Sequence, residues 1–188
     1  MTAQECGADF IGFVFANSRR RIAVQDAAAI VRQVDHIAKV GVFVNSSAAV
    51  VREIADVCQL DFVQLHGDES PDYCQSLKLP VIKAVRVGDD FNVDSLANYA
   101  VDWFLFDSYV PGKVGGTGKT FDWQQTAKLL RELQTPVMIA GGLTSENVGT
   151  AISCLQPQGV DVSGGVETDG CKDLAKIRCF LQAVYQSK

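Results

Sequence analysis

The sequence predicts an α/β protein built around one parallel sheet, and three observations support this fold class. Short apolar runs alternate with amphipathic stretches of helical period along the whole chain. The alternation repeats about every 20 to 25 residues, enough for one strand, one helix and their loops. Glycines and polar residues gather where the apolar runs end. Such a pattern is typical of a parallel sheet covered by helices.

The apolar runs predict seven strands, at residues 9–15, 39–45, 62–67, 80–87, 103–108, 136–142 and 159–165. Apolar residues at helical spacing predict helices at 24–34, 51–58, 71–77, 93–99, 123–133, 146–155 and 174–185. Ser46 and Ser47 are suitable N-caps for the second of these helices. No linker or low-complexity tract divides the array, so we expect a single domain over residues 1–188.

Eight strand–helix units close a (β/α)8 barrel, whereas a doubly wound sheet usually has five or six strands. Seven units are therefore one short of a barrel. The chain begins with what reads as the end of a helix and a glycine turn at Gly7 into the first visible strand. A helix in that place normally has its own strand before it. We therefore expect a (β/α)8 TIM barrel, N-terminally incomplete, whose first strand is missing.

Composition excludes several classes of protein. The chain of 188 residues is 47% hydrophobic and 21% charged, as in soluble globular proteins. A net charge of −5 disfavours nucleic acid and anionic membranes as partners, although the run at 19–21 is a local basic spot that could hold a phosphate. No apolar run is long enough to span a bilayer, and no targeting segment is visible. The oligomeric state is left open.

The six cysteines form no C-x-x-C pair, and most fall on apparently apolar helix faces. We interpret them as reduced core thiols of a cytoplasmic protein. A zinc site is disfavoured because only His36 and His66 are available and neither forms a ligand cluster with a cysteine.

The stretch at 103–123 places one carboxylate at the end of a buried strand. Its apolar residues lead directly into Asp107, and a loop rich in glycine follows, with Gly112, Gly115, Gly116 and Gly118. Ligands and catalytic groups collect at the carboxyl ends of parallel strands. A surface loop with a capping aspartate explains this segment equally well. A phosphate loop of the Walker type does not fit, because Lys113 stands where its first glycine is required.

Other unusual residues also follow predicted strands. Arg20 follows the first, and Gln64 and His66 close the third. The sixth ends in Gly141-Gly142 and the seventh in a segment that starts at Asp161 and contains Ser163, Gly164 and Gly165. Paired glycines before a helix allow close approach of a phosphate. Each feature also has a structural explanation, because histidines are often hydrogen-bonded in cores, glycines serve turns and arginines are solvated. Together they favour a sugar-phosphate enzyme.

Six segments resemble the phosphoribosylanthranilate isomerase family in order and spacing, over practically the whole chain. They are G-F-V-F-A-N-S-R-R-R, V-G-V-F-V-N, V-Q-L-H-G-D-E-S-P, F-D-S-Y-V-P-G-K-V-G-G-T-G-K-T-F-D-W, A-G-G-L-T-S-E-N-V and G-V-D-V-S-G-G-V-E. The resemblance implies a (β/α)8 barrel and an aldose–ketose isomerase of tryptophan biosynthesis. Its reaction is the Amadori rearrangement of N-(5-phosphoribosyl)anthranilate to 1-(2-carboxyphenylamino)-1-deoxyribulose 5-phosphate, without a metal or organic cofactor.

The resemblance also implies roles for single residues. Asp107 matches the general acid that protonates the ring oxygen, and Arg20 matches the arginine that holds the anthranilate carboxylate. Gln64, His66 and Asp161 match positions that line the pocket. The matches to the phosphate loops are Gly141, Gly142, Ser163, Gly164 and Gly165.

Two departures from the family pattern affect these expectations. Gly164 stands where the family usually has serine, so a hydroxyl donor is lost and the backbone N–H remains. The base of the family is a cysteine in a K-x-C-G motif on the first strand, and that strand is not found here. Cys6-Gly7 imitates the motif but leads into the first visible strand, so we expect Cys6 to lie away from the strand ends that carry the site.

Three hypotheses remain. The first is an isomerase of this family whose sequence here begins internally. The second is a truncated barrel that binds the phosphorylated ligand but lacks the catalytic base and does not turn over. The third, disfavoured by the loop after Asp107, is a related lyase or epimerase for sugar phosphates on the same barrel.

Overall fold

The computed structural model describes residues 2–87, 91–107, 127 and 130–187, and these divide into two compact units. The first unit comprises Ala3–Ala84 and Leu96–Trp103. The second unit comprises Thr2, Val85–Ser95 and the described residues from Phe104 onward. Within each unit, neighbouring strands of the sheet follow one another in chain order. The single domain expected from the sequence stays a prediction.

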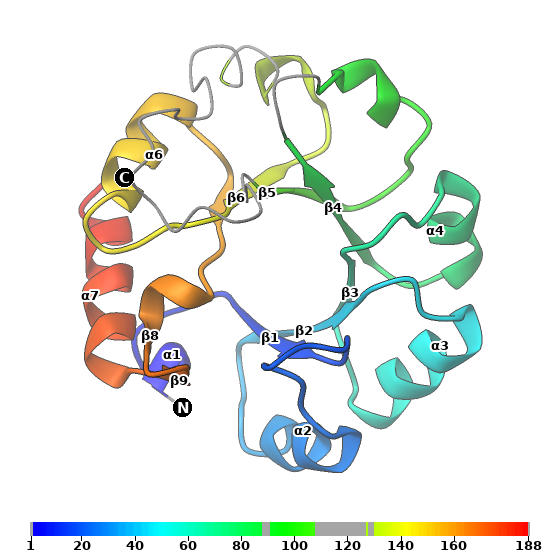
Figure 1. Cartoon of the computed structure of the whole chain (residues 1–188), viewed down its shortest axis with the longest axis horizontal. Helices are drawn as coiled ribbons and strands as arrows, with labels where there is room; N and C mark the ends of the chain where they lie inside the picture. The colour runs from blue at the N-terminus through cyan, green and yellow to red at the C-terminus, as the bar shows by residue number, and fades with distance from the viewer. Residues whose placement is uncertain (1, 88–90, 108–126, 128–129, 188) are drawn as a thin grey trace. The chain divides into compact units, whose positions relative to one another are not determined.

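Parallel strands and their crossover helices build the first unit. Its strands are β1 (Phe10–Val14), β2 (Ala38–Phe43), β3 (Phe62–Leu65) and the start of β4 (Val81–Arg86). Its helices are α1 (Thr2–Glu5), α2 (Val24–Val31), α3 (Ala48–Val57) and α4 (Pro71–Leu77). Neighbouring strands pair parallel, and Figure 1 shows α2, α3 and α4 on one side of them. Each crossover helix returns the chain to the amino end of the next strand.

Two clusters of buried apolar side chains hold these helices against the strands. Phe43 and Leu65, from β2 and β3, pack with Val51 and Ala55 of α3 and Leu77 of α4 in the larger cluster. Local signals fix the helix starts, because the predicted cap Ser47 accepts a hydrogen bond from the N–H of Val50 and begins α3. Burying one such side chain contributes roughly 1.5–3 kcal/mol.

The second unit repeats this arrangement with shorter strands. Its strands β5 (Trp103–Asp107), β6 (Val137–Ala140) and β7 (Gly159–Val160) pair parallel. The other elements are η1 (Val93–Leu96), α6 (Val148–Leu155), η2 (Gly164–Val166), β8 (Glu167–Thr168), β9 (Cys171–Lys172) and α7 (Leu174–Tyr185). All four residues of β6 are buried, as expected for a strand covered on both faces.

Several predicted elements are corrected. The helix predicted at 93–99 is only a 3-10 turn, because the Asn92 side chain accepts from the N–H of Asp94 while the Ser95 hydroxyl donates to the Asn92 carbonyl. The last strand, predicted at 159–165, ends at Val160. The antiparallel pair β8–β9 was not predicted, since two-residue strands carry no period. Ala127 and Leu130 are helical and buried, but most of the first two turns of the helix predicted at 123–133 lies outside the described residues.

The prediction that the cysteines are core thiols is correct for only two of the six. All six are free, but Cys154, Cys171 and Cys179 are exposed, and Cys6 is half-buried. Only Cys58 and Cys74 lie in the core. The error arises because the apolar residues of a helix can extend beyond the face that packs against the protein. In α7, for example, only Phe180 is fully buried.

Two glycines on neighbouring strands give the first prediction. Gly41→Ala on β2 places a Cβ against Leu60 and about 2.8 Å from the buried ring of Phe43, so we expect a loss of about 1–3 kcal/mol in the free energy of unfolding. Gly12→Ala on β1 is the control, because its Cβ meets only Val42, at 4.0 Å. Urea unfolding of both variants checks this, and equal stabilities would contradict the packing account.

Candidate active site

Asp107 lies where the sequence predicts it, as the last residue of β5. It is paired with Ala140, the last residue of β6, and its carbonyl accepts a hydrogen bond from the N–H of Val87 at 3.1 Å. These ladder contacts fix the backbone of a half-buried carboxylate at the carboxyl end of a rigid strand. The glycine-rich loop predicted after it, with Gly112, Gly115, Gly116 and Gly118, lies outside the described residues.

The two glycines after β6 have the backbone freedom that the sequence suggests. Gly141 and Gly142 have φ angles of 94° and 66°, which side chains with a Cβ rarely adopt. A Cβ on Gly142 would meet nothing within 4 Å. Open space beside a left-handed glycine allows a ligand to approach the backbone.

Asn147 shapes this glycine turn, and sequence reasoning missed it. Its Nδ2 donates to the carbonyl of Gly142 at 3.0 Å, and its Oδ1 accepts from the N–H of Thr144 at 2.8 Å. Thr144 accepts a hydrogen bond from the N–H of Glu146, and α6 starts later than predicted, at Val148. The only available signal was an asparagine three residues after a threonine.

The segment after β7 contacts the glycine turn after β6. A Cβ on Gly165 would collide with the carbonyl oxygen of Leu143, so only glycine fits there. This contact joins the two segments that contain the predicted phosphate residues, whose role stays a prediction. Asp161 donates its N–H to the Ile139 carbonyl at 2.8 Å, and its side chain is exposed.

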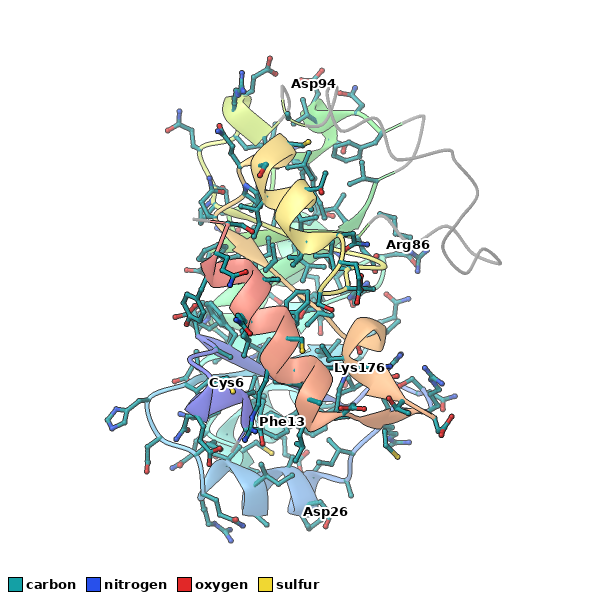
Figure 2. All side chains as sticks on the ribbon, turned by 90° about the vertical axis from the view of Figure 1, so that its left-hand side faces the viewer. Cys6, Phe13, Asp26, Arg86, Asp94 and Lys176 are labelled. Carbon is teal, nitrogen blue, oxygen red and sulfur yellow. The ribbon has the colours of Figure 1, made fainter. Side chains whose placement is uncertain are left out.

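Lys172 adds a cation that sequence reasoning did not identify. Its ammonium donates to the carbonyl of Ser163 at 2.8 Å and lies 3.4 Å from the Ser163 hydroxyl and 3.0 Å from the carboxylate of Glu167. Lys176, on the first turn of α7, donates to the Glu167 carbonyl at 2.7 Å (Figure 2). The β8–β9 hairpin thereby orients Ser163 and provides positive charge beside its hydroxyl.

The remaining predicted residues lie in the first unit. Arg20 is half-buried in the turn after β1, and its N–H donates to the Ser18 hydroxyl at 3.1 Å. Gln64 is buried, and its Nε2 lies 3.0 Å from Nδ1 of His66. Since an amide N–H donates, this contact favours the histidine tautomer that carries its proton on Nε2. His66 therefore has a side-chain partner, which agrees with the structural explanation given for it in the sequence analysis. It is half-buried and directly follows β3.

None of the six cysteines, all of which lie in the described residues, is found at the carboxyl end of a strand from β1 to β7. Cys6 stands between α1 and β1, at the amino end of that strand, as predicted. Burial raises the pKa of the Cys58 and Cys74 thiols and keeps both in the neutral form. The cysteine base implied by the resemblance therefore has no counterpart among them.

Within the described ranges, no three acidic, histidine or cysteine side chains are grouped so that they could hold a metal ion. None of the helices described there is long and apolar enough to cross a membrane.

Comparison with known sequences gives a single consistent result. The family described as N-(5'phosphoribosyl)anthranilate (PRA) isomerase matches residues 1–183. The N-(5'-phosphoribosyl)anthranilate isomerase of Moorella thermoacetica is 48% identical over 98% of this chain and 83% of its own length. The corresponding protein of Syntrophomonas wolfei is also 48% identical, over 99% of this chain and 91% of its own.

Solved structures agree. Phosphoribosyl anthranilate isomerase from Thermotoga maritima is 37% identical and superposes with a TM-score of 0.90 over 98% of this chain and 92% of its own. A phosphoribosyl anthranilate isomerase in complex with reduced 1-(o-carboxyphenylamino)-1-deoxyribulose 5-phosphate is 34% identical, with a TM-score of 0.86 over 98% of this chain and 91% of that one. The TIM-barrel fold class predicted from the sequence is confirmed.

Asp173 gives a prediction about pH. The Thr168 hydroxyl, followed by the N–H groups of Lys176 and Ala175, lowers the pKa of this helix cap. A lowered pKa in the folded state means that the cap contributes its full stability above the unfolded-state pKa of about 3.9 and loses it as the pH falls through the folded value. We expect the melting temperature of the wild type to fall more steeply below this pH than that of Asp173→Asn. Parallel acid-melting curves for the two proteins would contradict the assignment.

Proposed function

This chain belongs to the N-(5'-phosphoribosyl)anthranilate isomerase family, and we propose that it catalyses this isomerisation in tryptophan biosynthesis with Asp107 as the general acid. The observation that carries the proposal is the match of residues 1–183 to the family, with Asp107 at the end of β5. The reaction opens the ribose ring and moves a proton from C2, so it needs a donor for the ring oxygen and an acceptor for the C2 proton.

Asp107 is suited to donate the proton because its backbone is fixed within the β5–β6 ladder. A carboxyl group on a strand end holds its direction better than one on a loop, and proton transfer requires an approach of roughly 2.6–3.2 Å. The protonated carboxyl gives its proton to the ring oxygen as the bond between C1 and that oxygen breaks and the lone pair of the anthranilate nitrogen forms a C1=N bond, and the carboxylate remains. Loss of the C2 proton to the base then gives the enolamine, which tautomerises to the ketone product. This chemistry requires no metal or organic cofactor.

The substrate carries two anionic groups, and the proposal assigns a different part of the chain to each. Arg20 binds the anthranilate carboxylate, for which a planar guanidinium provides two parallel donors. The backbone N–H groups of Gly141, Gly142, Gly164 and Gly165 bind the phosphate, together with the Ser163 hydroxyl. Lys172 supports this role with its ammonium 3.4 Å from that hydroxyl.

Gln64, His66 and Asp161 complete the proposed pocket. Gln64 orients the His66 ring through their 3.0 Å contact. The exposed carboxylate of Asp161 follows β7 directly. Six free cysteines support a reducing compartment, so we place the enzyme in the cytoplasm. Its partner is the small phosphorylated substrate, and a net charge of −5 disfavours nucleic acid.

The positions of the cysteines keep the second hypothesis open. Because none of them lies at the carboxyl end of β1 to β7, the cysteine base of the family is unmatched, and a chain that binds the ligand without isomerising it is the alternative. Turnover followed by NMR distinguishes the two, since substrate and product are isomers of equal mass. Binding of the reduced product analogue without turnover would favour the alternative, and neither binding nor turnover would reject both.

Replacing the acid tests its role. We expect Asp107→Asn to lower kcat by about 10²–10⁴-fold while the reduced product analogue still binds, because the amide keeps the shape but cannot give up a proton. Asp94→Asn in η1 is the matched control, an exposed aspartate for which we expect no change. If Asp107→Asn turned over as fast as the control, Asp107 would not be the acid.

Substituting Arg20 and its neighbour Arg19 in turn distinguishes a specific contact with substrate from an effect of positive charge in general. We expect Arg20→Met to raise KM about 10- to 100-fold, the loss associated with one charged hydrogen-bonded contact of roughly 1.5–3 kcal/mol. Arg19→Met removes the same charge from an exposed position and should leave KM close to wild type. Equal effects of the two substitutions in steady-state kinetics would mean that the arginine run acts only through its overall charge.

A further inference from the structure

Lys83 is a buried ammonium to which the proposed mechanism gives no role. It lies in β4, where it is paired in register with Leu65 of β3, and its side chain is only 5% exposed. Its ion-pair partner Glu69, in the turn between β3 and α4, has a side chain that is 2% exposed. A buried ion pair is costly to desolvate and is weak evidence for stability, so its position needs another explanation.

The ammonium contacts the backbone on both sides of His66. Its Nζ lies 3.1 Å from the carbonyl of Leu65 and 2.8 Å from the carbonyl of Gly67, the residues before and after the histidine. It also lies 3.0 Å from the carbonyl of Ala84 and 3.1 Å from the Glu69 carboxylate. Three N–H donors facing four acceptors are fully used, so this lysine holds a turn rather than offering a donor to a ligand.

The carboxylate of Glu69 joins the ends of two strands. Its Oε2 accepts from the N–H of Gly67 at 2.9 Å, and its Oε1 accepts from the N–H of Asn45, just beyond β2, at 2.8 Å. The N–H of His66 itself donates to the carbonyl of Phe43 at 2.8 Å. The backbone from 65 to 67 is therefore held from β2, from β4 and from its own following turn.

We propose that Lys83 and Glu69 are positioning residues that hold the His66 turn in place for substrate, an inference that rests on the proposed function. The pair fixes the peptide groups around His66, and the contact with Gln64 then fixes the direction of its ring. An apolar pair of similar volume could fill the same space, but it could not hold three carbonyls and two N–H groups in one geometry.

The test compares three variants of the whole chain. Lys83→Met removes the ammonium but leaves a buried carboxylate, which is expected to reduce stability. The double variant Lys83→Met with Glu69→Met removes both charges, and we expect it to keep a folded core, so it can test the proposal even if the single variant does not fold. Arg52→Met is the control, because Arg52 also donates to two carbonyls, of Ser76 and Leu77, but does so between α3 and α4.

Two measurements apply to each variant. One is kcat and KM for isomerisation, where we expect the double variant to lose about 10- to 100-fold in kcat/KM, as ångström-scale misplacement does, and the control to lose none. The other is the nitrogen NMR spectrum of the imidazole rings. The chain has two histidines, and exposed His36 serves as the internal reference while the signals of His66 are expected to shift or broaden.

The outcomes are distinct. A folded double variant with unchanged His66 signals, or with changed signals but wild-type kcat/KM, would overturn the proposal. An equal loss of activity in Arg52→Met would mean that the double variant loses activity through reduced stability in general, and this would also overturn the proposal. If the wild type shows no isomerisation, the proposed function fails separately, and His66 signals together with affinity for the reduced product analogue decide whether the turn is positioned for a ligand.

Discussion

Parallel hydrogen bonding between neighbouring strands is the constraint on which the rest of the structure depends. Within each unit the strands pair in register and in one direction, so every strand needs a crossover before the next. The loops at the carboxyl ends of the strands are left free to carry polar groups. Asp107, His66 and Gly141 all occupy such places. The hydrogen-bonded strands determine where these residues lie, and the sequence of each loop determines which chemical groups are placed there.

Polar groups that the ladder leaves inside the protein must be satisfied by side chains. In the described part of the chain, no buried side-chain nitrogen or oxygen lacks a hydrogen-bond partner. Lys83 and Glu69 show how this is achieved, since their two charges satisfy one another and five backbone groups in and beside the His66 turn. Removal of one member of such a network leaves buried polar groups without partners and lowers the free energy of unfolding. The intact network makes the turn rigid, but a single substitution can disrupt it.

In the second unit, the proposed phosphate site is also held together by a few backbone and side-chain contacts. Gly165 fits against the carbonyl of Leu143 because it has no side chain, and this close approach joins two loops that are more than twenty residues apart in the sequence. Asn147 and Lys172 then fix one loop each through side-chain hydrogen bonds. The loss of a serine at Gly164 is tolerable for an anion site built mainly from backbone N–H groups.

The sequence by itself determined the order of strands and helices, the residues at the strand ends and the family. Periodicity and end signals are local, so α4 and α7 were predicted to the residue and Ser47 was recognised as a cap. Only the tertiary structure decided which apolar faces are covered, which is why exposed cysteines were mistaken for core residues. It alone revealed Asn147, Lys172 and the Lys83–Glu69 pair, because these residues act through contacts with groups placed nearby by folding, and no local pattern in the sequence reports such contacts.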